Sequence, residues 1–195
     1  MRNDVYPDIG CVILAAGRSS RLGNPKALIE VGDTSLISWM FSRLNRLGLN
    51  PIVVTREDLV ERIRNSIGDV EIVINEDPEL GRTGSVKKGL KFLKEGNSRE
   101  IKILIVPVDR PGFSMSTIEL LISSKSSSCP SSGGRGGHPL LVDNHDINRI
   151  LKASSDTPLN GIINPNKIDV KDPYLHLNVD TQEDVDEFLR VVDFL

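Results

Sequence analysis

Residues 14–28 combine glycines, small hydroxyl side chains and cations directly after an apolar run. Glycine and serine let backbone N–H groups approach an anion, and Arg18, Arg21 and Lys26 can neutralise its charge. The segment lacks the Gly-Lys-Ser/Thr of a P-loop and the GxGxxG spacing of a dinucleotide fingerprint. It predicts a cradle for a polyphosphate, and the alternative is an ordinary strand-to-helix connection with solvated charges.

A second candidate lies in residues 74–90, where a glycine-rich turn follows an expected strand and enters an expected helix. Asn75 stands at the end of that strand, and Gly84 and Ser85 stand at the start of the helix. N-terminal amides of a helix, together with a serine, can bind a base edge or a phosphate. The alternative is a capped helix whose lysines face solvent.

Acidic side chains follow two further expected strands. Asp109 comes directly after the most apolar strand, where an oxygen ligand for Mg²⁺ would sit beside substrate phosphates. Asp180 ends another expected strand and also begins a helix. The alternative for Asp109 is a turn or N-cap aspartate, and Asp180 taken alone is simply an N-cap.

Arg135 and His138 lie in a glycine-rich segment ahead of an apolar run. Flexible glycines before a rigid strand suit a loop that closes over a second substrate, whose phosphate both side chains can contact. The alternative is a disordered Ser/Gly loop in which His138 merely begins a strand.

The elements that must position these residues alternate between strand and helix. The expected strands lie over residues 10–17, 51–55, 70–74, 101–106, 139–142 and 174–179. The expected helices are one capped by Thr34 and closed by Gly48, and those over residues 57–67, 84–93, 116–123, 148–154 and 181–194.

Repeated βα units predict an α/β fold with a doubly wound, mostly parallel sheet and helices on both faces. Ligands of such sheets bind beyond the carboxyl ends of the strands, which is where the candidate residues stand. We expect one domain over residues 1–195, with a flexible Ser/Gly-rich loop over residues 123–137.

Composition excludes several classes of protein. The chain of 195 residues has 38% hydrophobic and 26% charged residues, and its net charge of −3 predicts no broad attraction to nucleic acid. Cys11 and Cys129 lie far apart, so we expect neither a disulfide scaffold nor a structural zinc site. With no apolar run of about 20 residues and no hydrophobic segment of a signal peptide, we expect no membrane association and a cytoplasmic location.

The run LAAGRSSRLGNPKAL resembles the LAAGxSxRxGxxKxL signature of the nucleoside-triphosphate transferases. It is most similar to the subgroup that attaches a nucleotide to molybdopterin cofactor, the MobA-like and MocA-like enzymes. This resemblance implies the Rossmann-type fold of the nucleoside-diphosphate-sugar transferases. It also implies that Arg21 and Lys26 contact the triphosphate and that the loop holds the nucleotide. The implied nucleotide-binding residues of the loop are Leu14, Ala15, Ala16, Gly17, Arg18 and Ser19.

The same resemblance favours CTP as the nucleotide. GTP-using relatives usually carry glycine at the position of Ala16, and the added methyl group would narrow a base pocket. Residues 81–90 are similar to the GxxxSxxxGL stretch that the cytidylyltransferases use in nucleotide recognition, which implicates Asn75, Gly84 and Ser85.

Three further stretches carry the resemblance. Asp109 and Pro111 match the DxP metal-binding element, and residues 134–142 resemble the GxxGHPxLF stretch. Residues 178–184 are similar to a D-x-D-T-P-E-D stretch in which the acid before Thr helps to hold metal, which implies that role for Asp180. Asn178 replaces the first acid and Gln182 the proline, so Asp180 is the sole acid of the pair.

Together these features predict a Mg²⁺-dependent nucleotidyltransferase that moves a nucleoside monophosphate from an NTP, by resemblance CTP, to molybdopterin cofactor or a similar small phosphorylated molecule. We assign Arg21, Lys26 and Asp109 to catalysis, Asp109 with Asp180 to the metal, and Arg135 with His138 to the acceptor. The alternatives are a GTP-using enzyme, an enzyme acting on a sugar, polyol or isoprenoid phosphate, and a non-catalytic nucleotide-binding module. The sequence identifies no molybdoenzyme or chaperone partner.

Overall fold

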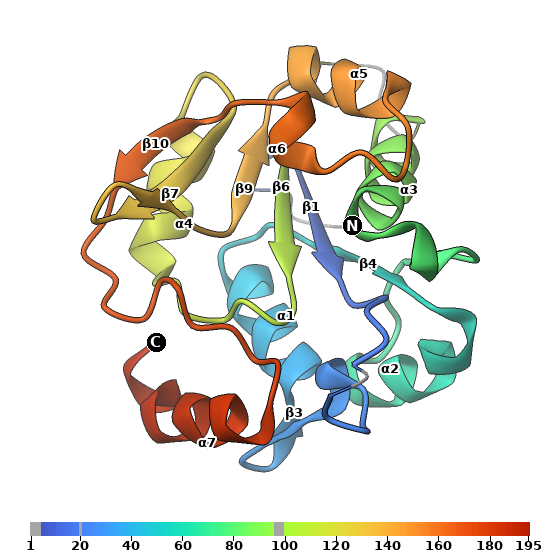
Figure 1. Ribbon diagram of the computed structural model, residues 1–195, viewed down its shortest axis with the longest axis vertical. Coiled ribbons are helices and arrows are strands. Elements are labelled where there is room, and N and C mark those ends of the chain that lie inside the picture. The colour runs from blue at the N-terminus through green and yellow to red at the C-terminus, as the bar shows by residue number, and fades with distance from the viewer. Residues whose placement is uncertain (1–4, 20, 96–99) are drawn as a thin grey trace.

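The computed structural model describes residues 5–19, 21–95 and 100–195, and its elements form helical layers on both sides of a central sheet (Figure 1). The strands are β1 (Ile9–Leu14), β2 (Glu30–Val31), β3 (Thr34–Ser35), β4 (Ile52–Thr55), β5 (Ile72–Ile74), β6 (Lys102–Pro107), β7 (Ser128–Ser132), β8 (Arg135–Gly136), β9 (Leu140–Val142) and β10 (Asn166–Asp169). The α-helices are α1 (Leu36–Arg46), α2 (Val60–Ile67), α3 (Arg82–Glu95), α4 (Met115–Ser123), α5 (Asn144–Lys152), α6 (Leu159–Ile162) and α7 (Gln182–Val191). Short 3₁₀ turns are η1 (Lys26–Leu28), η2 (Glu57–Leu59), η3 (Pro78–Leu80) and η4 (Val192–Phe194).

The central sheet has the strand order β10-β7-β9-β6-β1-β4-β5, and β8 pairs with β7. Strand β1 lies inside the sheet, between β6 and β4, and runs parallel to both of these neighbours. The pairs β4–β5 and β7–β10 are also parallel, whereas β9 is antiparallel to β6 and β7. The structure confirms the predicted mostly parallel sheet with helices on both faces.

The alternation of side chains along β1 divides the core into two clusters. Ile13 faces one cluster with the buried sides of α1, α2, α4 and α7, and Val12 faces the other with those of α3, α5 and α6. Because successive strand residues point to opposite faces, a strand buried on both sides is apolar throughout. This explains why residues 11–14 are all apolar and all buried.

Two expected elements differ in the structure. The predicted loop over residues 123–137 is wrong, because this segment forms the end of α4 and the strands β7 and β8. Serine and glycine have low intrinsic strand propensity, but pairing of β7 with β9 and β10 overrides it. The predicted strand over residues 174–179 is also wrong, because Leu177 N–H donates to the Tyr174 carbonyl at 2.8 Å and bends the backbone into a turn.

The start of α1 is shifted by one residue from the expected cap. Thr34 lies in the β2–β3 hairpin, and the neighbouring Ser35 caps α1 by accepting a hydrogen bond from Ser38 N–H. Within the described parts of the chain, no helix combines the length and apolar character needed to cross a lipid bilayer.

Candidate active site

A cavity of about 360 Å³ opens beyond the carboxyl ends of β1 and β6. The position agrees with the general rule for ligand sites of open α/β sheets. Most residues that the sequence singled out line it. The lining comprises Leu14, Ala15, Ala16, Gly17, Arg18, Ser19, Arg21, Pro25, Lys26, Ala27, Pro78, Gly81, Arg82, Ser85, Pro107, Val108, Asp109 and Asp180.

The loop after β1 is held by hydrogen bonds from outside it. Arg56 donates to the Gly17 carbonyl at 3.0 Å while its other nitrogens pair with Asp58, each at 2.9 Å. Ser19 adopts a φ of 53°, and its hydroxyl accepts a hydrogen bond from Lys26 N–H at 3.0 Å. The middle of the loop is therefore tied to the start of η1, and residues of the loop line one side of the cavity.

Lys26 lies between two carboxylates that are far apart in the sequence. Its Nζ donates to Asp109 Oδ2 at 3.3 Å and contacts Asp180 Oδ1. Lys26 and Asp109 are largely buried, with side-chain exposures of 13% and 16%. The fold thus brings together the cation of the loop, the acid after β6 and the acid before α7.

Hydrogen bonding keeps Asp180 ionised. The hydrogen bond from Lys26 lowers the pKa of this carboxyl below its usual value, and a hydrogen bond from Asn178 acts in the same direction. Asn178, which stands where the resembled pattern has an acid, therefore stabilises the ionised form of Asp180. The Asp180 N–H in turn donates to Asp184 Oδ2 at 2.9 Å, which fixes the acid at the start of α7.

Two arginines complete the charges around these acids. Arg21 NH1 lies 3.4 Å from Asp180 Oδ2, and Arg82 NH2 lies 3.6 Å from Asp109 Oδ2. Arg82 was not among the residues predicted from the sequence, although it is a cation in the first turn of α3, directly after Gly81. Arg18 points instead to Glu79 at 2.7 Å and is well exposed.

The residues expected after β5 are only partly at the cavity. Ser85 lines it, and Asn75 lies behind Ser85, whose hydroxyl accepts from Asn75 Nδ2 at 2.9 Å. Asn75 is buried at 2% exposure, so it orients Ser85. Gly84 is buried in the first turn of α3 and is not among the lining residues.

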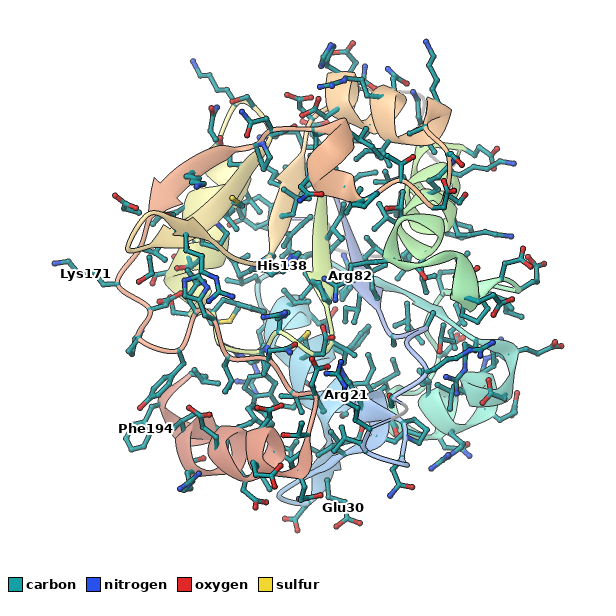
Figure 2. The ribbon with its side chains drawn as sticks, viewed as in Figure 1. Arg21, Glu30, Arg82, His138, Lys171 and Phe194 are labelled. Carbon is teal, nitrogen blue, oxygen red and sulfur yellow. The ribbon has the colours of Figure 1, made fainter. Side chains whose placement is uncertain are left out.

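Of the two residues expected at the acceptor, His138 lies in a neighbouring cavity of about 660 Å³, next to Arg82. Figure 2 shows His138 and Arg82 close to each other, above Arg21. Arg135 is exposed on β8 and lines neither of these two cavities. Burial, together with the charges of Arg82 and Arg110, lowers the pKa of His138 to about 4, so its imidazole is neutral near pH 7.

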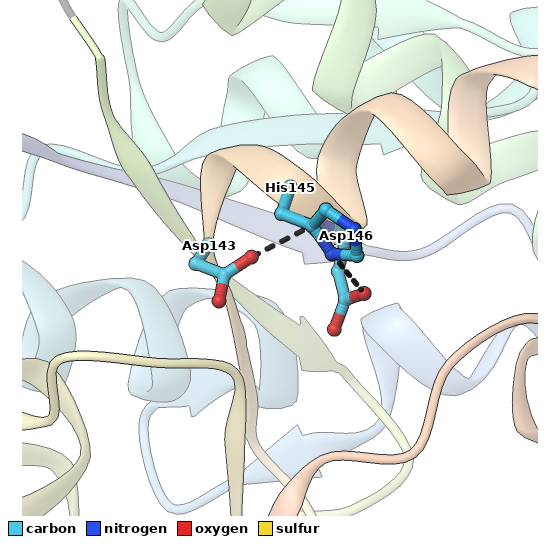
Figure 3. A group of neighbouring side chains, drawn as sticks. All are labelled: Asp143, His145 and Asp146. Carbon is cyan, nitrogen blue, oxygen red and sulfur yellow. Dashed lines mark hydrogen bonds and ion pairs between the residues drawn. The ribbon is translucent and has the colours of Figure 1, made fainter.

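A further acidic group lies at the start of α5. Ligand atoms of Asp143, His145 and Asp146 lie within 4.8 Å of one another (Figure 3). Asp143 caps the helix, since its carboxylate accepts from Asp146 N–H at 2.9 Å and from Ser127 N–H at 3.2 Å. Asp146 accepts from Arg149 at 3.2 Å. These hydrogen bonds cap and stabilise the N-terminus of α5, which accounts for the clustering of the three side chains.

Comparison with known proteins identifies the family. The sequence profile of the MobA-like NTP transferase domain matches residues 11–170, which is most of the chain. The chain belongs to the MobA-like NTP transferase family. The family is one of nucleotidyltransferases.

Individual relatives agree with this assignment. The Bifunctional protein GlmU of Francisella philomiragia is 32% identical over 121 residues, which is 60% of this chain and 26% of that protein. The match therefore spans about a quarter of the length of the curated relatives.

Solved structures share the fold over nearly the whole chain. A homologue of Mycobacterium tuberculosis Rv0371c from Mycobacterium sp. strain JC1 has a TM-score of 0.77 at 25% identity and covers 96% of this chain and 98% of its own. Rv0371c of Mycobacterium tuberculosis in complex with manganese has a TM-score of 0.72 at 20% identity, covering 94% and 98%. Molybdopterin-guanine dinucleotide biosynthesis protein A from Archaeoglobus fulgidus has a TM-score of 0.69 at 14% identity, covering 95% and 100%.

Proposed function

We propose that the protein is a Mg²⁺-dependent cytidylyltransferase that transfers CMP from CTP to the phosphate of molybdopterin cofactor or a similar small molecule, releasing pyrophosphate. The observation that carries this proposal is the contact of Lys26 Nζ with both Asp109 and Asp180 beside the loop after β1. Family membership supports the reaction type. The buried methyl group of Ala16, on the cavity wall, supports the smaller pyrimidine base.

The donor set suits a hard divalent cation. Mg²⁺ is bound in proteins through one or two carboxylates and the phosphates of the substrate. The Lys26 ammonium contacts both Asp109 and Asp180, so one cation placed between these carboxylates can reach an oxygen of each. When bound there, Mg²⁺ would supply charge neutralisation at the phosphates. A protein with the same fold has been solved in complex with manganese, which supports a divalent metal at this site.

The cations would bind the triphosphate. Lys26 and Arg21 lie on the loop side of the cavity and would neutralise the β- and γ-phosphates, while the backbone around Gly17 approaches the nucleotide. Charge builds up on the pyrophosphate during transfer, so fixed positive groups at its position stabilise the transition state more than the ground state. These side chains would therefore supply most of the rate acceleration.

The reaction requires no activated protein nucleophile. An oxygen of the acceptor phosphate forms a bond to the α-phosphorus of CTP, and the bond from that phosphorus to the oxygen that bridges it to the β-phosphorus breaks. The electron pair of the broken bond leaves with the pyrophosphate. A phosphomonoester is largely ionised at neutral pH, so no general base is needed. Positioning and electrostatics are then sufficient.

The first test is pyrophosphate release with CTP, GTP, ATP or UTP, with Mg²⁺, in the presence and absence of molybdopterin cofactor. We expect release with CTP that depends on the cofactor. Release with GTP instead would agree with the proposed mechanism but would contradict the proposal that Ala16 selects a pyrimidine base. Absence of release with every nucleotide would contradict the proposal, and a calorimetric titration of CTP would then show whether the protein only binds nucleotide.

A further inference from the structure

A further cavity, of about 470 Å³, lies where α1 meets the beginning of α4 and the end of η4 (Figure 1). It shares no lining residue with the cavity beside Lys26. One part of its lining carries hydroxyl groups and positive charge and comprises Thr34, Ser38, Ser42, Arg43 and Arg46. The other part is apolar and comprises Trp39, Leu47, Met115 and Leu195. The cavity therefore combines hydrogen-bond donors with an apolar surface.

Arg43 is a buried cation in this lining. The residue is only 7% exposed, and its guanidinium carbon lies 4.4 Å from the ring centroid of Trp39 and 5.2 Å from that of Phe113. Burial lowers the pKa of Arg43 to about 10, although the charge of Asp172 opposes this shift, so the side chain is positively charged at pH 7. Aromatic rings attract such a charge, but they are weak acceptors for its N–H groups.

One nitrogen atom of Arg43 has no hydrogen-bond partner. Nη2 donates to the Phe113 carbonyl at 2.9 Å, whereas Nη1 is buried and finds no acceptor among the residues that the structure describes. Buried polar atoms in native proteins are nearly always hydrogen-bonded, and an unsatisfied donor on a charged group is especially costly. An oxygen atom of a ligand would accept from Nη1 and relieve this cost.

Positive charge is in excess at this cavity. Within the described part of the chain, its lining contains two arginines and no acidic side chain. Arg46 lies three residues after Arg43 on α1, so both side chains project from the same face of the helix. The charge of Arg46 also lowers the pKa of Arg43, which shows that the two cations repel each other. An anion bound by both of them would remove this repulsion.

The mixed lining favours an anion that carries an apolar body. A phosphoryl group has three oxygen atoms, so it can accept from two guanidinium groups and from hydroxyl groups at once, which a carboxylate does less fully. Trp39 and Met115 offer the apolar body an aromatic and a flexible contact. The volume is in the range of about 300–1,000 Å³ that small-molecule sites occupy.

We propose that this cavity is a binding site for a small organic phosphate or phosphonate with an apolar body. The phosphoryl oxygens accept from Arg43 Nη1 and from Arg46, and the body lies against Trp39 and Met115. The site is separate from the nucleotide cavity, so this inference stands or falls independently of nucleotide transfer.

The test uses the fluorescence of Trp39, which is the single tryptophan of the chain and lines the cavity. The protein is titrated with phenylphosphonate, and separately with benzoate, benzyl alcohol and methylphosphonate. We expect a saturable change with phenylphosphonate. It should bind at least about tenfold more tightly than benzoate or benzyl alcohol, which carry a weaker acceptor group or no charge. It should also bind about tenfold more tightly than methylphosphonate, which has no aromatic body.

Variants locate the bound probe. Arg43→Met should weaken phenylphosphonate binding roughly tenfold, and Arg46→Met about threefold, because the Arg46 charge is exposed and screened by solvent. Arg64→Met, which removes an exposed arginine on α2, is the matched control and should leave the affinity unchanged. Lys26→Ala should leave it unchanged too, because Lys26 lies in the nucleotide cavity.

Circular dichroism checks that each variant is folded. If Arg43→Met is unfolded, Arg43→Lys replaces it and should still weaken binding, since an ammonium group cannot reproduce the planar guanidinium. The absence of a saturable change at up to about 10 mM phenylphosphonate would overturn the site. Equal or tighter binding of benzoate, benzyl alcohol or methylphosphonate would overturn the ligand class. Unchanged affinity in the folded Arg43 variant, or a loss in Lys26→Ala as large as in that variant, would overturn the assigned position.

Discussion

The single residue Lys26 connects the loop after β1, the loop after β6 and the segment before α7. Its backbone N–H donates to Ser19, and its ammonium contacts Asp109 and Asp180. Because the side chain is only 13% exposed, the charge acts in a poorly solvated environment, where electrostatic interactions are strong. The same residue can therefore balance the two acids before the substrate binds and the phosphates afterwards.

Replacing Lys26 should affect the chemical step more than the fold. For Lys26→Ala we expect kcat/KM to fall roughly 10²–10³-fold, because a charge aimed at the leaving group is lost. Steady-state pyrophosphate release measures this change, and circular dichroism checks the fold. Lys125→Ala, which removes an exposed lysine, is the matched control. Unaltered kinetics of Lys26→Ala would remove this residue from the site.

His138 gives the protein a pH-dependent stability. Burial, then the charges of Arg82 and Arg110, lower its pKa from 6.5 to about 4, and Asp109 opposes this shift. Between these two values the unfolded chain binds the proton and the folded chain does not, so stability falls as the pH drops from about 6.5 to about 4. Urea denaturation from pH 4 to 8 should show a shallower decline in His138→Gln. Parallel curves for the two proteins would contradict the assignment.

The loop after β6 and the segment before α7 hold each other in place. The loop after β6 carries Asp109, and its backbone carbonyl accepts a hydrogen bond from Val179 N–H at 2.9 Å. The same loop is fixed to α1, because Arg43 donates to the Phe113 carbonyl at 2.9 Å and lies over the ring of Trp39. The loop and the segment before α7 therefore place both proposed metal ligands relative to each other.

Gly112 allows these segments to approach. A Cβ atom at this position would collide with the Tyr174 backbone carbonyl, which is not a flexible group. We expect Gly112→Ala to lower the free energy of unfolding by about 3 kcal/mol and to reduce turnover, because Asp109 would shift relative to Asp180. The control is Gly161→Ala, whose added Cβ meets only an ordinary contact with Thr157. Equal stability of the two variants, measured by urea denaturation, would show that the approach is not tight.

The sequence predicts the elements unevenly. Strands β1, β4 and β6 are apolar runs with clear ends, and the structure confirms them. Strand β7 was missed because its residues are serine, cysteine and proline, and only its neighbours in the sheet make it a strand. Residues 174–179 alternate like a strand because their apolar side chains enter the core. Their backbone turns, however, which hydrophobic spacing alone does not reveal.

In the whole molecule, site residues that are close in the sequence were predicted, whereas contacts between distant segments were not. The loop after β1 is local in sequence, so its residues were found together, and the structure places them on one cavity wall. Arg82 and Arg110 act on His138 only because the fold brings three distant segments together. Such contacts depend on how the helices pack on the sheet. They leave no spacing signal in the chain, which is why the second cavity emerged from the structure.

Substrate binding should stabilise the whole molecule. A ligand that binds only the folded state at about 100 times its Kd adds about 2.7 kcal/mol, which for a chain of this size is a rise in Tm of about 5–10 °C. We expect this rise with CTP and Mg²⁺ together, and a smaller one with CTP alone. In Asp109→Asn the Mg²⁺-dependent part should be lost, as measured by differential scanning calorimetry. A rise in Asp109→Asn equal to that of the wild type would argue against Asp109 as a metal ligand.

We propose that nucleotide transfer takes place in the cavity beside Lys26, Asp109 and Asp180. The most direct measurement follows CTP labelled at the α-phosphorus, incubated with the protein, Mg²⁺ and molybdopterin cofactor, and identifies the labelled product. We expect the label to move onto the cofactor and an equal amount of pyrophosphate to be released. Label that stays in CTP, or that appears as free CMP, would contradict the proposal.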